Sequence, residues 1–263
     1  MPVFPRLVGL YEKRGYEIAS GLFPPHFGNW RDAAFTWLLR DGKSTTINLG
    51  IAQQELYFLE CLVSGWRPPN IFIVGNSFGW STLALALMAP RSRVVALDAC
   101  FTPDTKAGLV LTNLIAQEEK LNARALRGVS PADVPQVVSE QLGGAIDLAF
   151  IDGNHTNEAA LADFRAIRPH LRVGSVVLFH DAQTFNLFDG VKREEAEIGW
   201  AAQPLHSTPS GMVALFDPKQ LPAGVLETLK AFAPTSRAIK ALQGELAARK
   251  AAKQAKAGQP AAG

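Results

Sequence analysis

The segment Val74-Gly75-Asn76-Ser77-Phe78-Gly79-Trp80-Ser81-Thr82 decides the fold of this 263-residue chain. It follows a continuous apolar run, residues 71–74, which is typical of a strand buried on both faces of a parallel sheet. Two glycines frame a short polar turn, and the apolar run after it indicates a helix. Glycine permits a tight turn and lets a ligand approach the backbone. We therefore interpret the segment as a strand, a turn and a helix, with a candidate ligand site at the turn.

The spacing of Gly75 and Gly79 is GxxxG, which differs from the GxGxxG fingerprint of dinucleotide-binding turns. Taken alone, the same spacing fits an ordinary strand-to-helix turn without a ligand. Asp98 adds a second observation, because it ends the next apolar run, 23 residues after Gly75. An acidic side chain at that point can accept hydrogen bonds from both ribose hydroxyls. The pair therefore favours a nucleoside ligand.

Outward from this turn, strand-like and helix-like segments alternate. The expected strands are residues 71–74, 93–97, 125–129, 146–151 and 175–179, with a closing pair over 200–206 and 212–216. The expected helices are residues 51–63, 81–89, 106–121, 132–142, 157–171 and 187–198. This alternation predicts an α/β fold, a doubly wound Rossmann-like sheet that is mostly parallel, with an antiparallel closing strand and helices on both faces.

Acidic and histidine side chains follow the fourth and fifth expected strands. Asp152 and His155 come after one strand, and His180 and Asp181 come after the next. Because the carboxyl ends of parallel strands meet at one edge of a sheet, these side chains should share a cleft with Gly75. A single histidine would as readily be an exposed or hydrogen-bonded structural residue. The convergence of four such groups favours a catalytic site.

The motifs resemble those of class I S-adenosylmethionine-dependent methyltransferases. IFIVGNSFGWSTLALA is similar to their glycine-rich first motif and VVALDA to their acidic second motif, and the resemblance covers roughly residues 50–217. It implies that the cleft binds S-adenosylmethionine, with Asp98 on the ribose and Ser130 near the adenine. The implied cofactor-binding residues are Gly75, Asn76, Ser77, Gly79, Ser81, Asp98, Ala99, Ser130 and Asp152.

IDGNH (residues 151–155) and VVLFHDA (residues 176–182) resemble a subgroup of small O-methyltransferases, related to the catechol and antibiotic-sugar enzymes. In that subgroup acids after these strands bind magnesium, which implies Asp152, His180 and Asp181 as metal ligands. The resemblance also implies His155 as the catalytic base. His180 departs from the catechol type, which has an oxygen ligand there, and Mg²⁺ prefers oxygen to imidazole. Mg²⁺, and the choice between His155 and His180 as the catalytic base, therefore stay open.

These observations together predict O-methylation of a small-molecule or sugar hydroxyl, with His155 or a divalent metal activating the acceptor. An NAD(P)-dependent oxidoreductase would share the fold, but the missing third glycine argues against it. A non-catalytic binding protein with the methyltransferase fold is the remaining alternative. It would bind the cofactor without turnover, or not bind it.

Composition and charge restrict the partners. The net charge is only +2, and part of the basic surplus lies in the last fifteen residues, so we expect no nucleic-acid partner. The start of the chain lacks a signal-peptide core, and no run reaches the ~18 apolar residues of a membrane span. We therefore expect a cytoplasmic protein with a small-molecule acceptor and no membrane partner. Apolar residues near the start would allow a homodimer.

The chain divides into three expected parts. Residues 1–50 form a helical and loop attachment, whose aromatic residues are candidates for a lid over the acceptor. Residues 51–246 form the methyltransferase domain. Residues 247–263 are rich in alanine, lysine and glycine, and we expect them to be a flexible tail of frayed helix followed by disorder.

Overall fold

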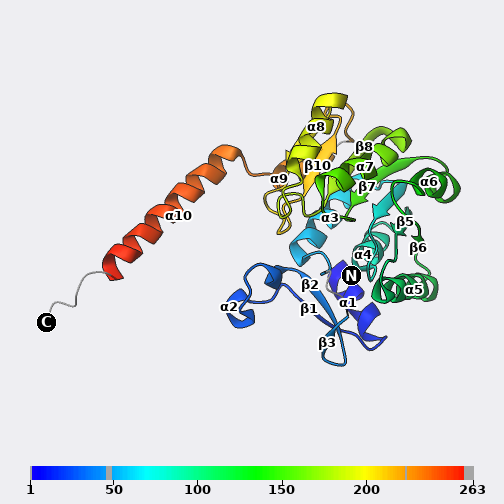
Figure 1. Ribbon diagram of the computed structural model, residues 1–263, viewed down its shortest axis with the longest axis horizontal. Helices are drawn as coiled ribbons and strands as arrows, with labels where there is room; N and C mark the ends of the chain where they lie inside the picture. Colours follow the sequence, from blue (N-terminus) through cyan, green and yellow to red (C-terminus); the bar gives the residue numbers. More distant parts are fainter. Residues whose placement is uncertain (1, 46–48, 223, 258–263) are drawn as a thin grey trace.

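A seven-stranded sheet lies at the centre of the computed structural model, which describes residues 2–45, 49–222 and 224–257 (Figure 1). Its strand order is β6-β5-β4-β7-β8-β10-β9. The strands are β4 (Asn70–Val74), β5 (Arg93–Asp98), β6 (Ala123–Arg127), β7 (Ile146–Ile151), β8 (Leu171–Phe179), β9 (Ala201–Pro204) and β10 (Val213–Phe216). The strands from β6 to β8 are parallel, and β10 is antiparallel to both of its neighbours. The predicted doubly wound sheet with an antiparallel closing strand is confirmed.

The strand order reverses beside β4. The chain runs outward from β4 to β5 and β6, and then returns to β7 on the other side of β4. At such a point the helices that follow neighbouring strands lie on opposite faces of the sheet, which leaves a crevice at the carboxyl ends of the strands. The glycine-rich turn after β4 lies at this crevice.

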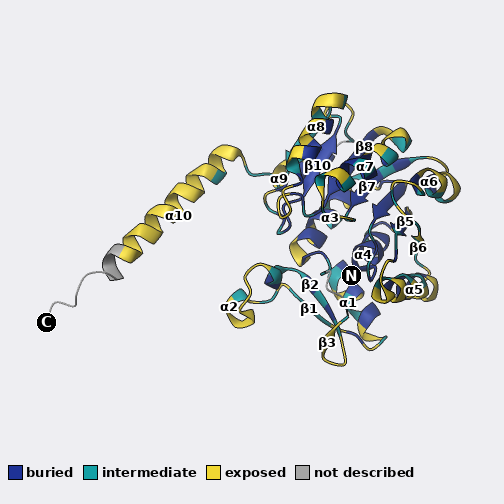
Figure 2. Ribbon diagram, in the orientation of Figure 1, coloured by how far each residue is buried: buried dark blue, intermediate teal, exposed yellow. Residues whose placement is uncertain are grey.

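Helices cover both faces of the sheet. On one face lie α1 (Val3–Glu12), α3 (Gln53–Trp66), α4 (Trp80–Met88), α5 (Pro103–Glu118) and α9 (Val225–Ala231). On the other lie α6 (Val134–Leu142), α7 (Asn157–Ile167) and α8 (Phe188–Ile198). Within β4, Ile71 and Ile73 pack on the first face, whereas Phe72 and Val74 pack on the second. This two-sided burial explains the continuous apolar runs, and Figure 2 shows the strands as the buried centre of the molecule.

The amino-terminal segment contains a second sheet that the sequence analysis did not anticipate. Strands β1 (Glu17–Ser20), β2 (Thr36–Arg40) and β3 (Lys43–Ser44) are antiparallel, and the short helix α2 (Pro24–Phe27) lies between the first two. We expected helix and loop here. Side chains along β2 alternate in burial, which suits the β-branched and aromatic residues of a strand.

Helix α1 packs against the helix that follows the glycine-rich turn. The hydroxyl of Tyr11 donates a hydrogen bond to the carbonyl oxygen of Phe78 at 2.7 Å, and its ring lies 5.3 Å from that of Trp80. The amino-terminal attachment therefore supports the turn from outside the central sheet.

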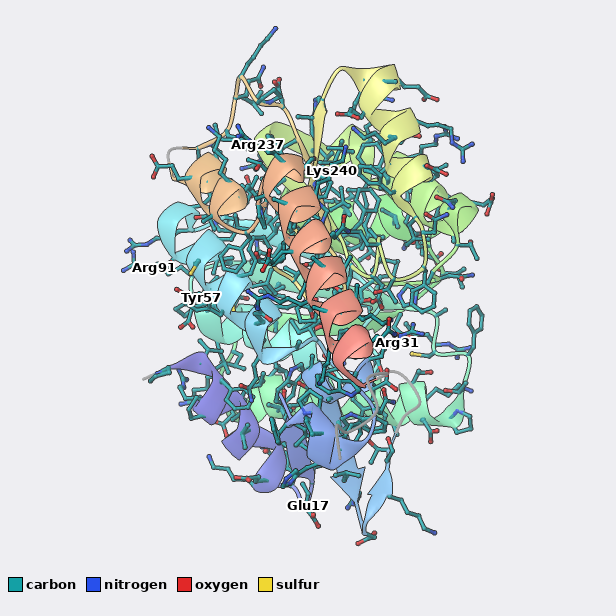
Figure 3. All side chains as sticks on the ribbon, turned by 90° about the vertical axis from the view of Figure 1, so that its left-hand side faces the viewer. Glu17, Arg31, Tyr57, Arg91, Arg237 and Lys240 are labelled. Carbon is teal, nitrogen blue, oxygen red and sulfur yellow. The ribbon has the colours of Figure 1, made fainter. Side chains whose placement is uncertain are left out.

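Helix α10 (Ser236–Ala257) projects away from the rest of the molecule (Figure 1). Arg237 and Lys240, labelled in Figure 3, lie near its start, and Leu242 and Leu246 on it are more than half exposed. The helix continues past residue 247, where the expected tail begins, because alanine, lysine, glutamine and leucine are strong helix formers. Residues 258–263 of that tail lie outside the described residues. Across the described part of the chain, no helix combines the length and apolar character that crossing a membrane would require.

Candidate active site

A cleft of about 940 Å³ opens at the carboxyl ends of the parallel strands. Among the predicted site residues it is lined by Gly75, Asn76, Ser77, Ser81, Asp98, Ala99, Ser130, Asp152, His155, His180 and Asp181. Gly79 does not line it. A Cβ atom at Gly79 would lie 2.1 Å from Oγ1 of Thr112, so this glycine allows α5 to pack closely on the turn.

Asn76 shapes the turn from within. Its side-chain nitrogen donates hydrogen bonds to the carbonyl oxygen of Ser77 at 2.9 Å and to Oγ1 of Thr112 at 3.0 Å. Its side-chain oxygen accepts a hydrogen bond from Oγ1 of Thr82 at 3.0 Å. The side chain of Asn76 is thus engaged with the protein itself.

Asp98 holds the same turn through its carboxylate. Oδ2 accepts hydrogen bonds from the backbone nitrogens of Asn76 and Ser77, both at 2.8 Å, and Oδ1 accepts one from Cys100 at 2.7 Å. Hydrogen bonds to an ionised acceptor are stronger than neutral ones. The structure therefore gives Asp98 a role in shaping the turn, and its contact with a ribose stays a prediction.

Two buried polar atoms at the turn lack a hydrogen-bond partner among the described residues. They are Oγ of Ser77 and Nε1 of Trp80, and both residues line the cleft. Buried polar atoms in folded proteins are nearly always hydrogen-bonded. These two are therefore available to a polar group of a ligand, and Trp80 was not among the residues that the sequence singled out.

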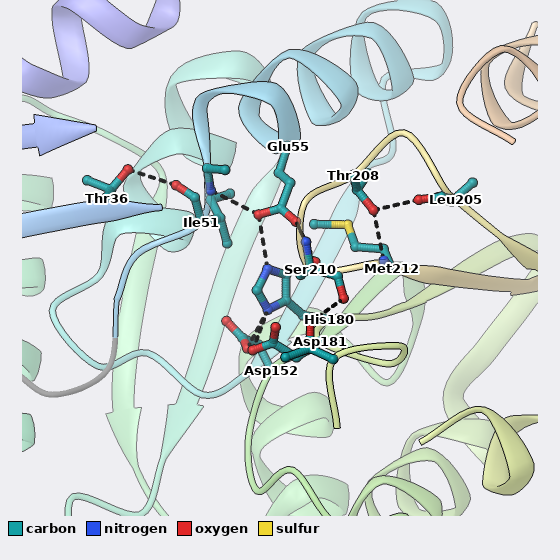
Figure 4. A network of polar contacts seen from close by, with 12 residues as sticks. Thr36, Ile51, Glu55, Asp152, His180, Asp181, Leu205, Thr208, Ser210 and Met212 are labelled. Atoms are coloured by element: carbon teal, nitrogen blue, oxygen red, sulfur yellow. Dashed lines mark hydrogen bonds and ion pairs between the residues drawn. The ribbon is translucent and has the colours of Figure 1, made fainter. Parts of the chain in front are cut away.

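His180 lies between Glu55 on one side and Asp152 and Asp181 on the other (Figure 4). Its Nδ1 is 3.1 Å from Oδ1 of Asp152 and 3.4 Å from Oδ2 of Asp181, and its Nε2 is 3.2 Å from Oε2 of Glu55. Burial of the ring opposes its charged form, but the negative charges of Asp152 and Glu55 outweigh burial and hold the pKa of His180 well above its usual range. Both ring nitrogens thus face carboxylates.

His155 lies nearer the mouth of the cleft, against the same two acids. Its Nε2 is 3.4 Å from Oδ1 of Asp152 and 3.6 Å from Oδ2 of Asp181, and its ring stacks on Phe185 at 4.5 Å. Burial opposes the charged ring, yet the hydrogen bond and charge of Asp152, with the charge of Asp181, raise the pKa of His155. Burial likewise opposes the charged form of Asp152, but the charge of His180 and the contacts with both histidines lower its pKa to about 2.

The ligand atoms of Asp152, His155 and Asp181 all lie within 4.8 Å of one another. This cluster differs from the predicted metal set of Asp152, His180 and Asp181, because it contains His155 in place of His180. His180 is also close to both aspartates, because its Nδ1 lies 3.1 Å from Oδ1 of Asp152 and 3.4 Å from Oδ2 of Asp181, while its Nε2 faces Glu55.

Sequence reasoning missed Glu55. It lies on α3, has no exposed surface, and is 125 positions from His180. A single acid on the apolar face of an amphipathic helix, next to Leu56 and Leu59, is the signal that could have found it.

The sequence of the central part of the chain matches a known family. Residues 73–182, which run from β4 to just past β8, match the family model of a methyltransferase domain. Residues 73–182 are a methyltransferase domain. This match confirms the resemblance to class I methyltransferases and argues against the nicotinamide-dependent alternative.

Solved structures share the fold of this methyltransferase domain. A methyltransferase from Geobacter sulfurreducens superposes with a TM-score of 0.54 over 84% of this chain and 91% of its own, at 13% sequence identity. A TDP-rhamnose 3'-O-methyltransferase of calicheamicin biosynthesis superposes with a TM-score of 0.51 over 62% of this chain and 78% of its own, at 21% identity. At these identities the likeness establishes the fold alone. No curated protein sequence matches the chain.

Proposed function

We propose that this chain is an S-adenosylmethionine-dependent O-methyltransferase that acts on a small-molecule or sugar hydroxyl. The observation that carries the proposal is the position of His155 in the cleft of a methyltransferase domain, with Nε2 next to the carboxylates of Asp152 and Asp181. A hydroxyl group must lose its proton to become a strong nucleophile, and an imidazole with a neighbouring acid is suited to accept it.

The proposed cofactor would bind at the glycine-rich turn. S-adenosylmethionine supplies an electrophilic methyl group on its sulfonium when bound. The unpartnered Oγ of Ser77 and Nε1 of Trp80 fit a ligand with polar groups at the turn, and Asp98 also lines the cleft with a carboxylate that can accept hydrogen bonds from hydroxyl groups. These residues are our candidates for its binding site.

His155 is our candidate for the base. Its Nε2 would take the proton of the acceptor hydroxyl, and Asp152 and Asp181 would stabilise the imidazolium that forms. General-base catalysis of this kind contributes roughly 10²- to 10⁴-fold in rate. His180 is a weaker candidate for the base, because it is only 4% exposed and both of its nitrogens face carboxylates.

A divalent metal is the second way to activate the acceptor. The cluster of Asp152, His155 and Asp181 offers two carboxylates and one imidazole within 4.8 Å, and Nδ1 of His180 lies beside the same two carboxylates. Mg²⁺ prefers oxygen ligands, so a mixed set fits a transition metal better than Mg²⁺. A metal there would lower the pKa of the acceptor hydroxyl.

The acceptor class is supported by one of the solved structures. The sugar-nucleotide enzyme named above has the same fold and acts on a hydroxyl, which suits a sugar acceptor. A cytoplasmic location, a homodimer, the lid role of the amino-terminal segment, and the absence of nucleic-acid and membrane partners stay predictions.

The proposal is tested by methyl transfer from labelled S-adenosylmethionine to a panel of phenols, sugars and nucleotide sugars. His155→Ala should reduce turnover about 100-fold or more while S-adenosylhomocysteine affinity stays near that of the wild type. His170→Ala is the matched control, because His170 lies outside the cleft. Equal turnover of both variants and the wild type would remove His155 from the mechanism.

A further inference from the structure

Glu55 is a buried carboxylate that the proposed mechanism leaves unused. It lies in the first turn of α3 with no exposed surface, beside core residues such as Leu56 and Leu59. Burying a carboxylate costs free energy unless the group is paired and hydrogen-bonded. A helix position of this kind is usually filled by an apolar side chain, so its contacts need an explanation.

Four contacts occupy both oxygens of Glu55. Oε1 accepts hydrogen bonds from the backbone nitrogen of Ser210 at 2.9 Å and from its hydroxyl. Oε2 accepts one from the backbone nitrogen of Ala52 at 2.9 Å and lies 3.2 Å from Nε2 of His180. Figure 4 shows Glu55 between Ser210 and His180. The carboxylate cannot rotate without losing several of these contacts, so its position is fixed.

His180 connects this fixed carboxylate to the cleft. The two oxygens near its Nδ1, Oδ1 of Asp152 and Oδ2 of Asp181, are the same two atoms that lie near Nε2 of His155. A rotation or shift of the His180 ring would therefore change where these oxygens lie relative to His155.

We propose that Glu55 is a positioning residue for methyl transfer, which fixes the ring of His180 and thereby holds the carboxylates of Asp152 and Asp181 against His155. Its effect on turnover rests on the proposed function. No residue of α3 lines the cleft, so Glu55 acts through His180. The competing explanation is purely structural, namely that Glu55 caps α3 through Ala52 and holds the loop before β10 through its hydrogen bonds with Ser210.

The variant Glu55→Gln tests this proposal, because it keeps the size of the side chain but leaves only one oxygen to accept hydrogen bonds. Glu194→Gln is the matched control. Glu194 is equally buried, forms an ion pair with Arg165 at 2.8 Å, lies on α8 and does not line the cleft. On the full chain we would measure the ring resonances of His155 by NMR, the affinity for S-adenosylhomocysteine by calorimetry, and kcat and KM separately.

In Glu55→Gln we expect the His155 resonances to shift and kcat to fall about tenfold or more, because small displacements of reacting groups cost rate steeply. KM and S-adenosylhomocysteine affinity should stay near the wild-type values, and Glu194→Gln should change none of these quantities. Unchanged His155 resonances and kcat in Glu55→Gln, or the same losses in Glu194→Gln, would overturn the proposal.

Two further measurements cover the cases in which Glu55→Gln does not fold or the wild type shows no turnover. If Glu55→Gln does not fold, Glu55→Asp answers the same question, since it withdraws the carboxylate from His180, and unchanged His155 resonances would overturn the proposal. If the wild type transfers no methyl group to any acceptor, the proposed function fails. The NMR comparison then still decides whether Glu55 positions the residues of the cleft, because it needs no turnover.

Discussion

Gly75 and Asp152 lie so close together that a side chain at position 75 would collide with the backbone of the neighbouring strand end. A Cβ atom on Gly75 would lie 2.1 Å from the carbonyl oxygen of Asp152, and Gly75 has a φ of +94°. The backbone nitrogen of Asp152 also donates a hydrogen bond to the carbonyl oxygen of Val74 at 2.8 Å. The candidate cofactor turn and the acid beside the candidate base are thus joined through their backbones.

Gly75→Ala should destabilise the fold by about 2–5 kcal/mol, the sum of backbone strain at positive φ and overpacking. Gly144→Ala is the control, because Gly144 has a φ of +81° but no atom within 4 Å of its would-be Cβ. That variant should lose only the stability that backbone strain costs, about 1–2 kcal/mol. Urea unfolding measures both. Equal losses would mean that the backbone at Asp152 moves aside at little cost.

Asp98→Ala should weaken the binding of S-adenosylhomocysteine at least about tenfold, since each charge-assisted hydrogen bond contributes roughly 1.5–3 kcal/mol. The substitution removes the acceptor of three backbone hydrogen bonds, two of them from the turn, besides the predicted ribose contact. Asp104→Ala, an exposed acid in the first turn of α5, serves as the control in calorimetry. Unchanged affinity in Asp98→Ala would exclude Asp98 from the cofactor site.

Turnover should depend on pH through His155. The base accepts a proton only when neutral, and its pKa lies above the ordinary value of 6.5, so kcat should fall as the pH drops through this raised pKa. Asp152 has a pKa of about 2 and stays ionised over that range. Asp152→Asn removes the charge that raises the pKa of His155, so the rising limb of the pH profile should move to lower pH. Asp189→Asn, on the surface of α8, should leave the limb in place. If the rising limb does not move in Asp152→Asn, the charge of Asp152 does not raise the pKa of the catalytic base.

Chelation separates the two ways of activating the acceptor. If His155 acts as the base, treatment with EDTA followed by gel filtration should leave kcat unchanged. A loss of activity that Mg²⁺ or Mn²⁺ restores would instead assign the cluster of Asp152, His155 and Asp181 to a metal.

Much of the fold could be predicted because it depends on local pattern. Apolar runs buried on both faces of the sheet mark the parallel strands β4, β5, β7 and β8, and the glycine-rich turn marks the point where the strand order reverses. The small amino-terminal sheet could not be predicted in this way. Its strand β2 follows the helix-like pair Ala33-Ala34, and its pairing with β1 across sixteen or more positions leaves no local pattern.

The residues of the site likewise divide into those that local sequence pattern predicts and those that only the folded structure brings together. Asp152, His155, His180 and Asp181 were predictable because each directly follows a strand whose carboxyl end points to the cleft. Glu55 was not, since it lies on a helix and reaches His180 only in the folded protein. The contacts of Asp98 with the turn also depend on backbone geometry that no spacing of residues displays.

The central claim, that the cleft is the cofactor site of a methyltransferase, is tested most directly by calorimetric titration of the full chain with S-adenosylhomocysteine, with NAD as the control. The account predicts micromolar binding of S-adenosylhomocysteine, weakened in Asp98→Ala, and no heat with NAD. Absence of S-adenosylhomocysteine binding, or tighter binding of NAD, would contradict it.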